Sequence, residues 1–359
     1  MSGNVSALIS RIYRNFISKC KSNNDGTHEY AYVTNQGSNN ICQYIITAQG
    51  CLAPLAAAPI AAGTTPVFIA ASPTGKHAYV ANQGGNSISQ YRINSQGSLE
   101  AIATPVEAGT SPVEIAFDPS GSYAYVANSS SNDVSQYLIG DDGLLTAMSP
   151  ATIATGMIPV AVAVDPSGQY AYVVNNSSNS ISQYVITKNG SLQTMSRASI
   201  ATGAAPRSIA ISPSGKYAYV LNRTSGNISQ YTITPDGSLD PVSTEVATGK
   251  HPISISFAPS GKYAYVANQN SNSISQYTVA EDGSLEPMTP ATVASLGTPV
   301  CVAVSASGIY VYVSNISSDR VSQYSIDGQG GLRPIIVNTW GDATVAAETS
   351  PRCVMTVKI

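Results

Sequence analysis

The chain repeats one segment seven times at nearly constant spacing, and this repeat constrains the fold more than any single motif. Its clearest form is Tyr-Ala-Tyr-Val-x-Asn, and successive copies lie 47, 46, 47, 47, 46 and 47 residues apart. The copies end at Asn35, Asn82, Asn128, Asn175, Asn222, Asn268 and Asn315. A period of this length, filled with strand-forming residues, is typical of one propeller blade per repeat. We therefore predict an all-β, seven-bladed β-propeller over residues 29–359.

Each repeat divides into four predicted antiparallel strands separated by turn residues. In the third copy, the apolar run after Pro112 predicts a strand buried on both faces. The sequence Asp-Pro-Ser-Gly at 118–121 follows it and predicts a type I turn. Alternating residues at 123–127 and 134–139, and a last strand that ends near Ala154, complete the predicted sheet.

The first and last strands of the chain predict how the ring closes. The chain enters the first blade at its second strand, residues 30–34, without a preceding first strand. The missing strand occurs at the other end of the chain, at residues 351–357. We predict that this C-terminal strand pairs into the N-terminal blade and covers its open edge. Removal of residues 351–359 is then expected to destabilise the whole ring.

Residues 1–28 lie outside the repeat and form a separate segment. Apolar residues recur at helical spacing from Leu8 to Cys20, and basic residues lie opposite them. Three interpretations stay open: a helix packed on the propeller, peripheral membrane contact through residues 8–20, or a targeting address. The sequence has no classical signal peptide and no stretch apolar enough to span a bilayer. We expect either a cytoplasmic protein or export by a non-classical route.

Composition and charge argue against several classes of partner. The net charge of −3 gives no reason to expect nucleic acid as a partner. The five cysteines have no metal-type spacing, so we expect neither a metal site nor a disulfide framework. Cys301 and Cys353 hold equivalent positions in neighbouring blades, where they either approach one another or serve as small apolar residues. We expect a monomer without a cofactor.

A Gly-x-Leu element follows the third strand of every repeat and carries a resemblance to a known family. It begins at Gly50, Gly97, Gly143, Gly190, Gly237, Gly283 and Gly330. With the Tyr-Val-x-Asn segments, it makes the chain resemble YVTN-repeat propellers and, more closely, the seven-bladed lactonase superfamily of 6-phosphogluconolactonase-like proteins. The resemblance implies catalytic histidine, arginine and carboxylate groups near the central channel. In this family a histidine often follows soon after the proline that begins the first strand of a blade. No histidine follows those prolines here.

The repeat itself separates scaffold from site, because a residue present in all seven blades serves the blade. A Gln-Tyr pair recurs in the third strand of each repeat, and we therefore assign these pairs to hydrogen bonds within and between blades. His77 is assigned as a substitute for the repeated tyrosine. Charged residues that break the repeat gather on one rim of the ring. The candidate ligand-binding residues are Arg207, Arg352, Lys250, Arg223 and Arg320, and the candidate proton acceptors are Glu114 and His251.

Two functions are compatible with these residues. The leading hypothesis is a non-catalytic scaffold that binds a protein or polysaccharide partner through its loop-rich rim, where Trp340 lies in the insertion before the last strand. The alternative is hydrolysis or cyclisation of a small anionic lactone at the channel mouth, with Arg207 and Arg352 binding the anion. Arginines that point into a polar pocket near Glu114 or His251 would favour the enzyme.

Overall fold

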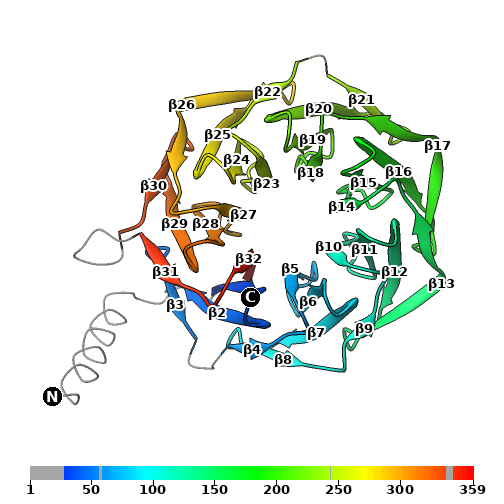
Figure 1. Cartoon of the computed structure of the whole chain (residues 1–359), viewed down its shortest axis with the longest axis horizontal. Coiled ribbons are helices and arrows are strands. Elements are labelled where there is room, and N and C mark those ends of the chain that lie inside the picture. The colour runs from blue at the N-terminus through cyan, green and yellow to red at the C-terminus, as the bar shows by residue number, and fades with distance from the viewer. Residues whose placement is uncertain (1–27, 56–58, 243, 337–342) are drawn as a thin grey trace.

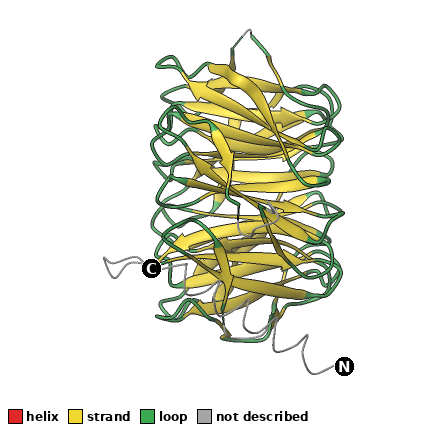
Figure 2. Cartoon of the chain, turned by 90° about the vertical axis from the view of Figure 1, so that its left-hand side faces the viewer, coloured by secondary structure: helices red, strands yellow, loops and turns green. Residues whose placement is uncertain are grey.

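The computed structural model describes residues 28–55, 59–242, 244–336 and 343–359. These residues form strands and loops and contain no helix. Seven antiparallel sheets surround a central axis, which confirms the seven-bladed propeller (Figure 1). The loops that join the strands gather on the two faces of the ring (Figure 2). The predicted helix at 8–20 and Trp340 lie outside the described residues.

The strand nearest the axis begins with proline in every blade. In order around the ring these strands are β32 (Pro351–Lys358), β5 (Pro66–Ala71), β10 (Pro112–Phe117), β14 (Pro159–Val164), β18 (Pro206–Ile211), β23 (Pro252–Phe257) and β27 (Pro299–Val304). The second strands are β1 (Glu29–Asn35), β6 (His77–Asn82), β11 (Tyr123–Asn128), β15 (Tyr170–Asn175), β19 (Tyr217–Asn222), β24 (Tyr263–Asn268) and β28 (Tyr310–Asn315).

The third and outermost strands complete each sheet. The third strands are β2 (Asn40–Ile46), β7 (Ser87–Ile93), β12 (Asp133–Ile139), β16 (Ser180–Ile186), β20 (Asn227–Ile233), β25 (Ser273–Val279) and β29 (Arg320–Ile326). Three blades have one continuous outer strand, namely β13 (Leu145–Ala154), β17 (Leu192–Ala201) and β26 (Leu285–Ala294). The others have two short outer strands each, namely β3 (Leu52–Pro54) with β4 (Ile60–Ala61), β8 (Leu99–Ala101) with β9 (Val106–Glu107), β21 (Leu239–Pro241) with β22 (Val246–Ala247), and β30 (Leu332–Pro334) with β31 (Thr344–Ala346).

The C-terminal strand closes the ring, as the sequence predicts. β32 pairs antiparallel with β1, and β1 pairs with β2, so the two ends of the chain share one blade. In this register Tyr32 lies opposite Met355 and Val33 lies opposite Val354. The pairing satisfies the backbone groups of β1, which would otherwise be an open edge.

Neighbouring blades are joined by the repeated glutamine and tyrosine residues. In the third blade, the Gln136 side-chain oxygen Oε1 accepts a hydrogen bond of 2.6 Å from the backbone N–H of Leu192 in the next blade. The Tyr125 hydroxyl donates to the Gly190 carbonyl oxygen of that same blade at 2.6 Å. All seven blades make both contacts. The structure thus confirms that the glutamines belong to the scaffold.

The Gly-x-Leu elements are explained by the same seam between blades. Gly190 has a φ of 81°, and a Cβ atom there would lie 2.2 Å from the ring of Tyr123. Glycine is therefore required both by the backbone conformation and by the tyrosine that packs on it. His77 packs in the same way against Gly143, which confirms that it replaces the repeated tyrosine.

Candidate active site on the propeller axis

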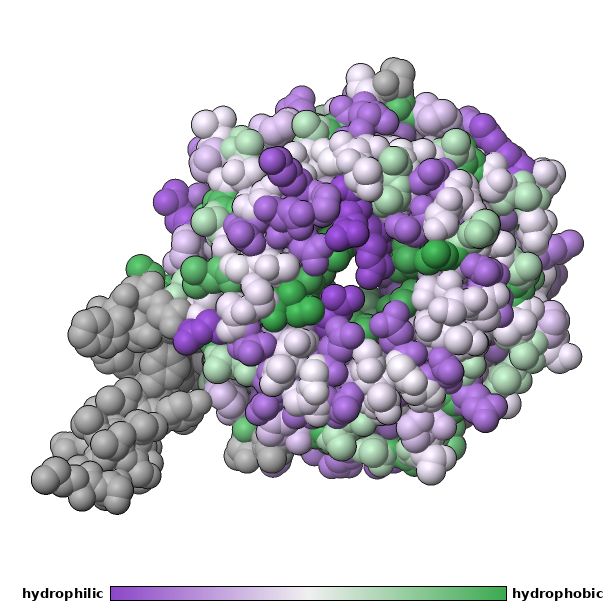
Figure 3. Space-filling view, viewed as in Figure 1, coloured by the Kyte–Doolittle hydropathy of each residue, from purple (hydrophilic) through white to green (hydrophobic). Residues whose placement is uncertain are grey.

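A cavity of about 450 Å³ lies on the axis of the ring and is lined mainly by the innermost strands. Figure 3 shows the opening at the centre of the ring, with hydrophilic side chains gathered around part of its mouth. Most of the lining residues are apolar, because the innermost strands carry the runs of Val, Ile and Ala that follow each proline, but polar side chains also contribute to the exposed surface of the cavity. Its charged members are Glu114, Arg207 and Arg352. A cavity of this size suits a small organic molecule.

The three charged residues occupy positions that are uncharged in the other blades. Arg207 and Arg352 directly follow the strand-opening proline, and Glu114 is one residue further along its strand. The residues equivalent to the arginines are Val67, Val113, Val160, Ile253 and Val300, and those equivalent to Glu114 are Phe68, Ala161, Ser208, Ser254, Cys301 and Cys353. The fold thus brings together the residues that break its own symmetry.

The cavity holds these charges in surroundings that disfavour charge. Burial raises the pKa of Glu114 from its ordinary value of 4.5 to about 8, although the nearby Arg207 charge acts in the opposite direction. Burial and the Arg352 charge lower the pKa of Arg207 from 12.5 to about 10, and this group stays protonated at neutral pH. Such perturbed groups in one cavity are typical of functional sites.

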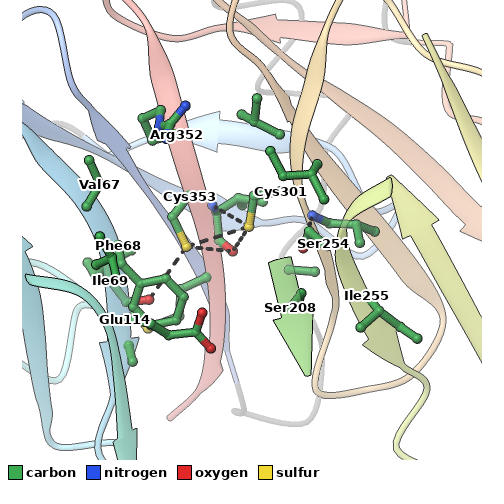
Figure 4. A pocket seen from close by; sticks show the side chains of 18 of the residues that line it. Val67, Phe68, Ile69, Glu114, Ser208, Ser254, Ile255, Cys301, Arg352 and Cys353 are labelled. Carbon is green, nitrogen blue, oxygen red and sulfur yellow. Dashed lines mark hydrogen bonds between the residues drawn. The ribbon is translucent and has the colours of Figure 1, made fainter. Parts of the chain in front are cut away.

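The polar atoms of these side chains are largely free to meet a ligand. The Arg207 Nη1 atom donates to the Val160 carbonyl oxygen at 3.1 Å, which anchors one side of that guanidinium. Within the described parts of the chain, neither the Glu114 carboxylate nor the Arg352 guanidinium makes a hydrogen bond or an ion pair. Figure 4 shows Glu114 and Arg352 on strands of different blades around the cavity. A carboxylate that is partly shielded from water and has no partner is costly, so its place here needs a functional reason.

Two cysteines lie in the wall of the same cavity. The Sγ atoms of Cys301 on β27 and Cys353 on β32 are 3.6 Å apart, and both residues are free thiols (Figure 4). Their shared hydrogen bond lowers the pKa of Cys301 and raises that of Cys353. The backbone N–H of Val354 also donates to the Cys301 sulfur at 3.4 Å. The two side chains therefore do approach one another, which was one of the two interpretations of their spacing.

The remaining candidates lie outside the axial cavity. Arg223, Lys250 and His251 line a second hollow, at the loops between the fifth and sixth blades. His251 is thus separated from Glu114, and the two do not form one acid–base pair. Arg320 donates to the Thr344 hydroxyl at 2.7 Å, in the outer part of the seventh blade. The structure brings three of the seven candidates, Glu114, Arg207 and Arg352, into the axial cavity.

The lining of the axial cavity also contains polar residues that were not predicted from the sequence, namely Gln83, Ser208, Ser254 and Thr356. Gln83 lies in the lining, just after the second strand of the second blade. Glutamine also stands at the equivalent positions 36 and 269, so Gln83 does not break the repeat and could not be selected as a site residue on that ground.

Within the described ranges no cluster of three His, Cys, Asp or Glu residues has the geometry to hold a metal ion. No helix in the described part of the chain is long and apolar enough to cross a membrane.

Comparison with known proteins identifies the family. The family model described as "Lactonase, 7-bladed beta-propeller" matches residues 23–162, 107–255 and 141–304, which together cover more than half of the chain. No curated protein matches the chain.

Several solved structures share the fold at low sequence identity. A candidate 6-phosphogluconolactonase from Bacteroides uniformis is 21% identical, with 92% of this chain and 99% of that one covered at a TM-score of 0.79. A second candidate 6-phosphogluconolactonase, from Bacteroides fragilis, is 20% identical, with coverage of 94% and 99% and a TM-score of 0.80. A periplasmic gluconolactonase from Pseudomonas aeruginosa is 21% identical, with coverage of 92% and 99% and a TM-score of 0.78. The chain belongs to the seven-bladed lactonase family of β-propellers.

Proposed function

We propose that this protein hydrolyses a small anionic lactone in its axial cavity. The observation that carries the proposal is the convergence of Glu114, Arg207 and Arg352, the charges that break the sevenfold repeat of the innermost strands, on one cavity. The family match supports the same reaction class, and structural relatives carry the names 6-phosphogluconolactonase and gluconolactonase.

The two arginines provide the recognition of the substrate. A guanidinium group stays charged at neutral pH and presents planar donors that match carboxylate or phosphate oxygens. Arg207 and Arg352 come from the fifth and first blades, so they approach the cavity from different sides of the ring. With one carboxyl group against two guanidinium groups, the cavity carries a net positive charge, which favours an anionic ligand over a neutral one.

Glu114 provides the proton transfer. Its carboxylate takes a proton from a water molecule as the water oxygen attacks the lactone carbonyl carbon. The ring C–O bond then breaks, and the ring oxygen leaves as a hydroxyl group after it receives the proton back from Glu114. The product is the open hydroxy acid. A carboxyl group with a pKa of about 8 is a stronger base than an ordinary glutamate, because it binds the abstracted proton more tightly.

A panel of sugar lactones, with and without an anionic substituent, tests the proposal through the rate of acid release at constant pH. We expect ring opening by the parent protein, and a loss of at least about 100-fold in kcat/KM in the Arg207→Met, Arg352→Met double variant. Arg197→Met is the matched control, because Arg197 pairs with Asp240 on exposed outer strands. A parent protein without activity on any lactone, or a folded double variant with full activity, would overturn the proposal.

This proposal adopts the second of the two hypotheses drawn from the sequence. The family match and the cavity support the lactonase better than a non-catalytic scaffold that binds through its rim. Binding of a protein or polysaccharide at the rim stays a prediction, as does membrane contact through residues 8–20.

A further inference from the structure

Six of the seven blades share a hydrogen bond that ties each blade to the entry of the next. The residue just before the third strand is Asn or Asp, and its side-chain oxygen accepts from the backbone N–H of the residue before the next strand-opening proline. The N···O distances are 2.7 or 2.8 Å. The pairs are Asn39 with Thr65, Asn86 with Ser111, Asn132 with Ile158, Asn179 with Ala205, Asn272 with Thr298 and Asp319 with Ser350.

The fifth blade departs from this rule. Its equivalent residue is Gly226, which has the same kind of backbone conformation, with a φ of 69°. The donor at the entry of the next blade is the backbone N–H of His251, and within the described residues it has no acceptor. A Cβ atom on Gly226 would meet nothing closer than the Gly249 carbonyl oxygen at 3.9 Å. The space that a side chain fills in the other six blades is therefore open here.

A hollow of about 450 Å³ occupies this place, and buried side-chain nitrogen atoms in its lining lack hydrogen-bond partners. The Arg223 Nε and His251 Nδ1 atoms are both buried, and neither has a hydrogen-bond partner in the described structure. The other side of the Arg223 guanidinium is fixed, because Nη2 donates to the Gln269 side-chain oxygen at 3.1 Å. Lys250 adds a second positive charge at the edge, and among the residues that the structure describes no Asp or Glu lines the hollow. Buried polar atoms without a hydrogen-bond partner are rare in folded proteins.

From this geometry we infer that the hollow beside Gly226 binds a small oxyanion, a carboxylate or a phosphate. One ligand oxygen takes the place of the missing asparagine oxygen and accepts from the His251 backbone N–H. The same anion accepts from Arg223 Nε and lies next to the charge of Lys250. This site is separate from the axial cavity, and the anion that it binds need not be the lactone substrate proposed for that cavity.

The repeat provides the variant that tests the inference. Gly226→Asn restores the residue type found in five of the other six blades, and its backbone conformation already suits asparagine. The new side-chain oxygen is expected to satisfy the His251 N–H and fill the hollow. Isothermal titration of the parent protein with acetate and with inorganic phosphate, at constant ionic strength, should show saturable binding of at least one anion. Gly226→Asn should weaken that binding more than tenfold and raise Tm by about 2 °C.

Two further variants separate this site from its surroundings. Arg223→Met should weaken binding about tenfold or more, because it removes the unpaired Nε donor. Asn179→Gly is the matched control: it opens the same gap in the fourth blade, where the facing loop, residues 203–205, carries no charge, and it should create no new anion site. The inference fails if the parent binds neither anion below about 10 mM. It also fails if Gly226→Asn leaves binding unchanged while the Arg207→Met, Arg352→Met variant removes it, because the anion would then occupy the axial cavity.

Discussion

Replacing Glu114 by glutamine should abolish activity and at the same time stabilise the folded protein. In the fold, burial in the cavity raises the pKa of this carboxyl from 4.5 to about 8. The folded state therefore binds its proton more tightly than the unfolded chain does. The group costs no stability below about pH 4.5, and the cost grows as the pH rises towards 8, where both states become ionised.

The size of this cost follows from the shift. At about 1.4 kcal/mol per pH unit, a rise from 4.5 to about 8 corresponds to an upper bound of about 5 kcal/mol. Glu114 is partly exposed to the channel, so solvent screens its charge, and we expect about 3 kcal/mol. The unfolding free energy of Glu114→Gln should therefore exceed that of the parent by an amount that grows by about 3 kcal/mol between pH 5 and pH 8.5.

Urea unfolding of both proteins across this pH range measures the difference directly. Glu286→Gln is the control, because Glu286 is an exposed carboxylate on the outer strand β26, and its difference from the parent should stay constant with pH. Parallel stability profiles for Glu114→Gln and the parent would refute the reasoning, because they would show that Glu114 has an ordinary pKa in the folded state.

Three other predictions follow from named contacts. Arg207→Met removes a charge that lowers the pKa of Glu114, so the midpoint of the rising pH–rate profile should move to higher pH; an unchanged midpoint in a variant with measurable activity would contradict this. Gln183→Ala removes the acceptor that lies 2.8 Å from the buried backbone N–H of Leu239 in the next blade, and should lower the free energy of unfolding in urea by about 1–3 kcal/mol. Gln193→Ala, at an exposed position on an outer strand, is the control and should change this free energy by less than about 0.5 kcal/mol. Iodoacetamide should modify Cys301 before Cys353, because the pKa of Cys301 is lowered and that of Cys353 is raised, and mass spectrometry of the native protein that found equal rates would exclude this difference.

The locations of the site residues show where prediction from the sequence stops. The position of Arg207 and Arg352 directly after the strand-opening prolines places them near the channel, because that strand is the innermost of each blade. His251 stands equally close to a proline in the sequence, and Lys250 is one residue further away. They nevertheless lie in a separate hollow, because His251 precedes the proline, in a loop where its φ is 55°. A difference of two residues along the chain thus decides which cavity a side chain enters.

The absence of an asparagine at Gly226 was visible in the sequence, but its consequence was not. Asparagine is common in turns, so the sequence alone assigns no further role to an asparagine before a third strand. Only the structure shows that the asparagine oxygen bonds to the next blade, 25 or more residues away in the chain. A missing long-range acceptor then becomes a hollow with unpaired donors.

Sequence alone determined the number of blades, the strand order and the closure of the ring, because these depend on local strand and turn preferences repeated at a fixed period. The glycine and glutamine positions could also be assigned to the scaffold from their recurrence in every blade. The tertiary structure decided which charges share a cavity, how strongly burial shifts the pKa of Glu114, and where donors stay unpaired. These properties arise from contacts between distant blades and from the exclusion of water, and neither is encoded in the spacing of residues along one repeat.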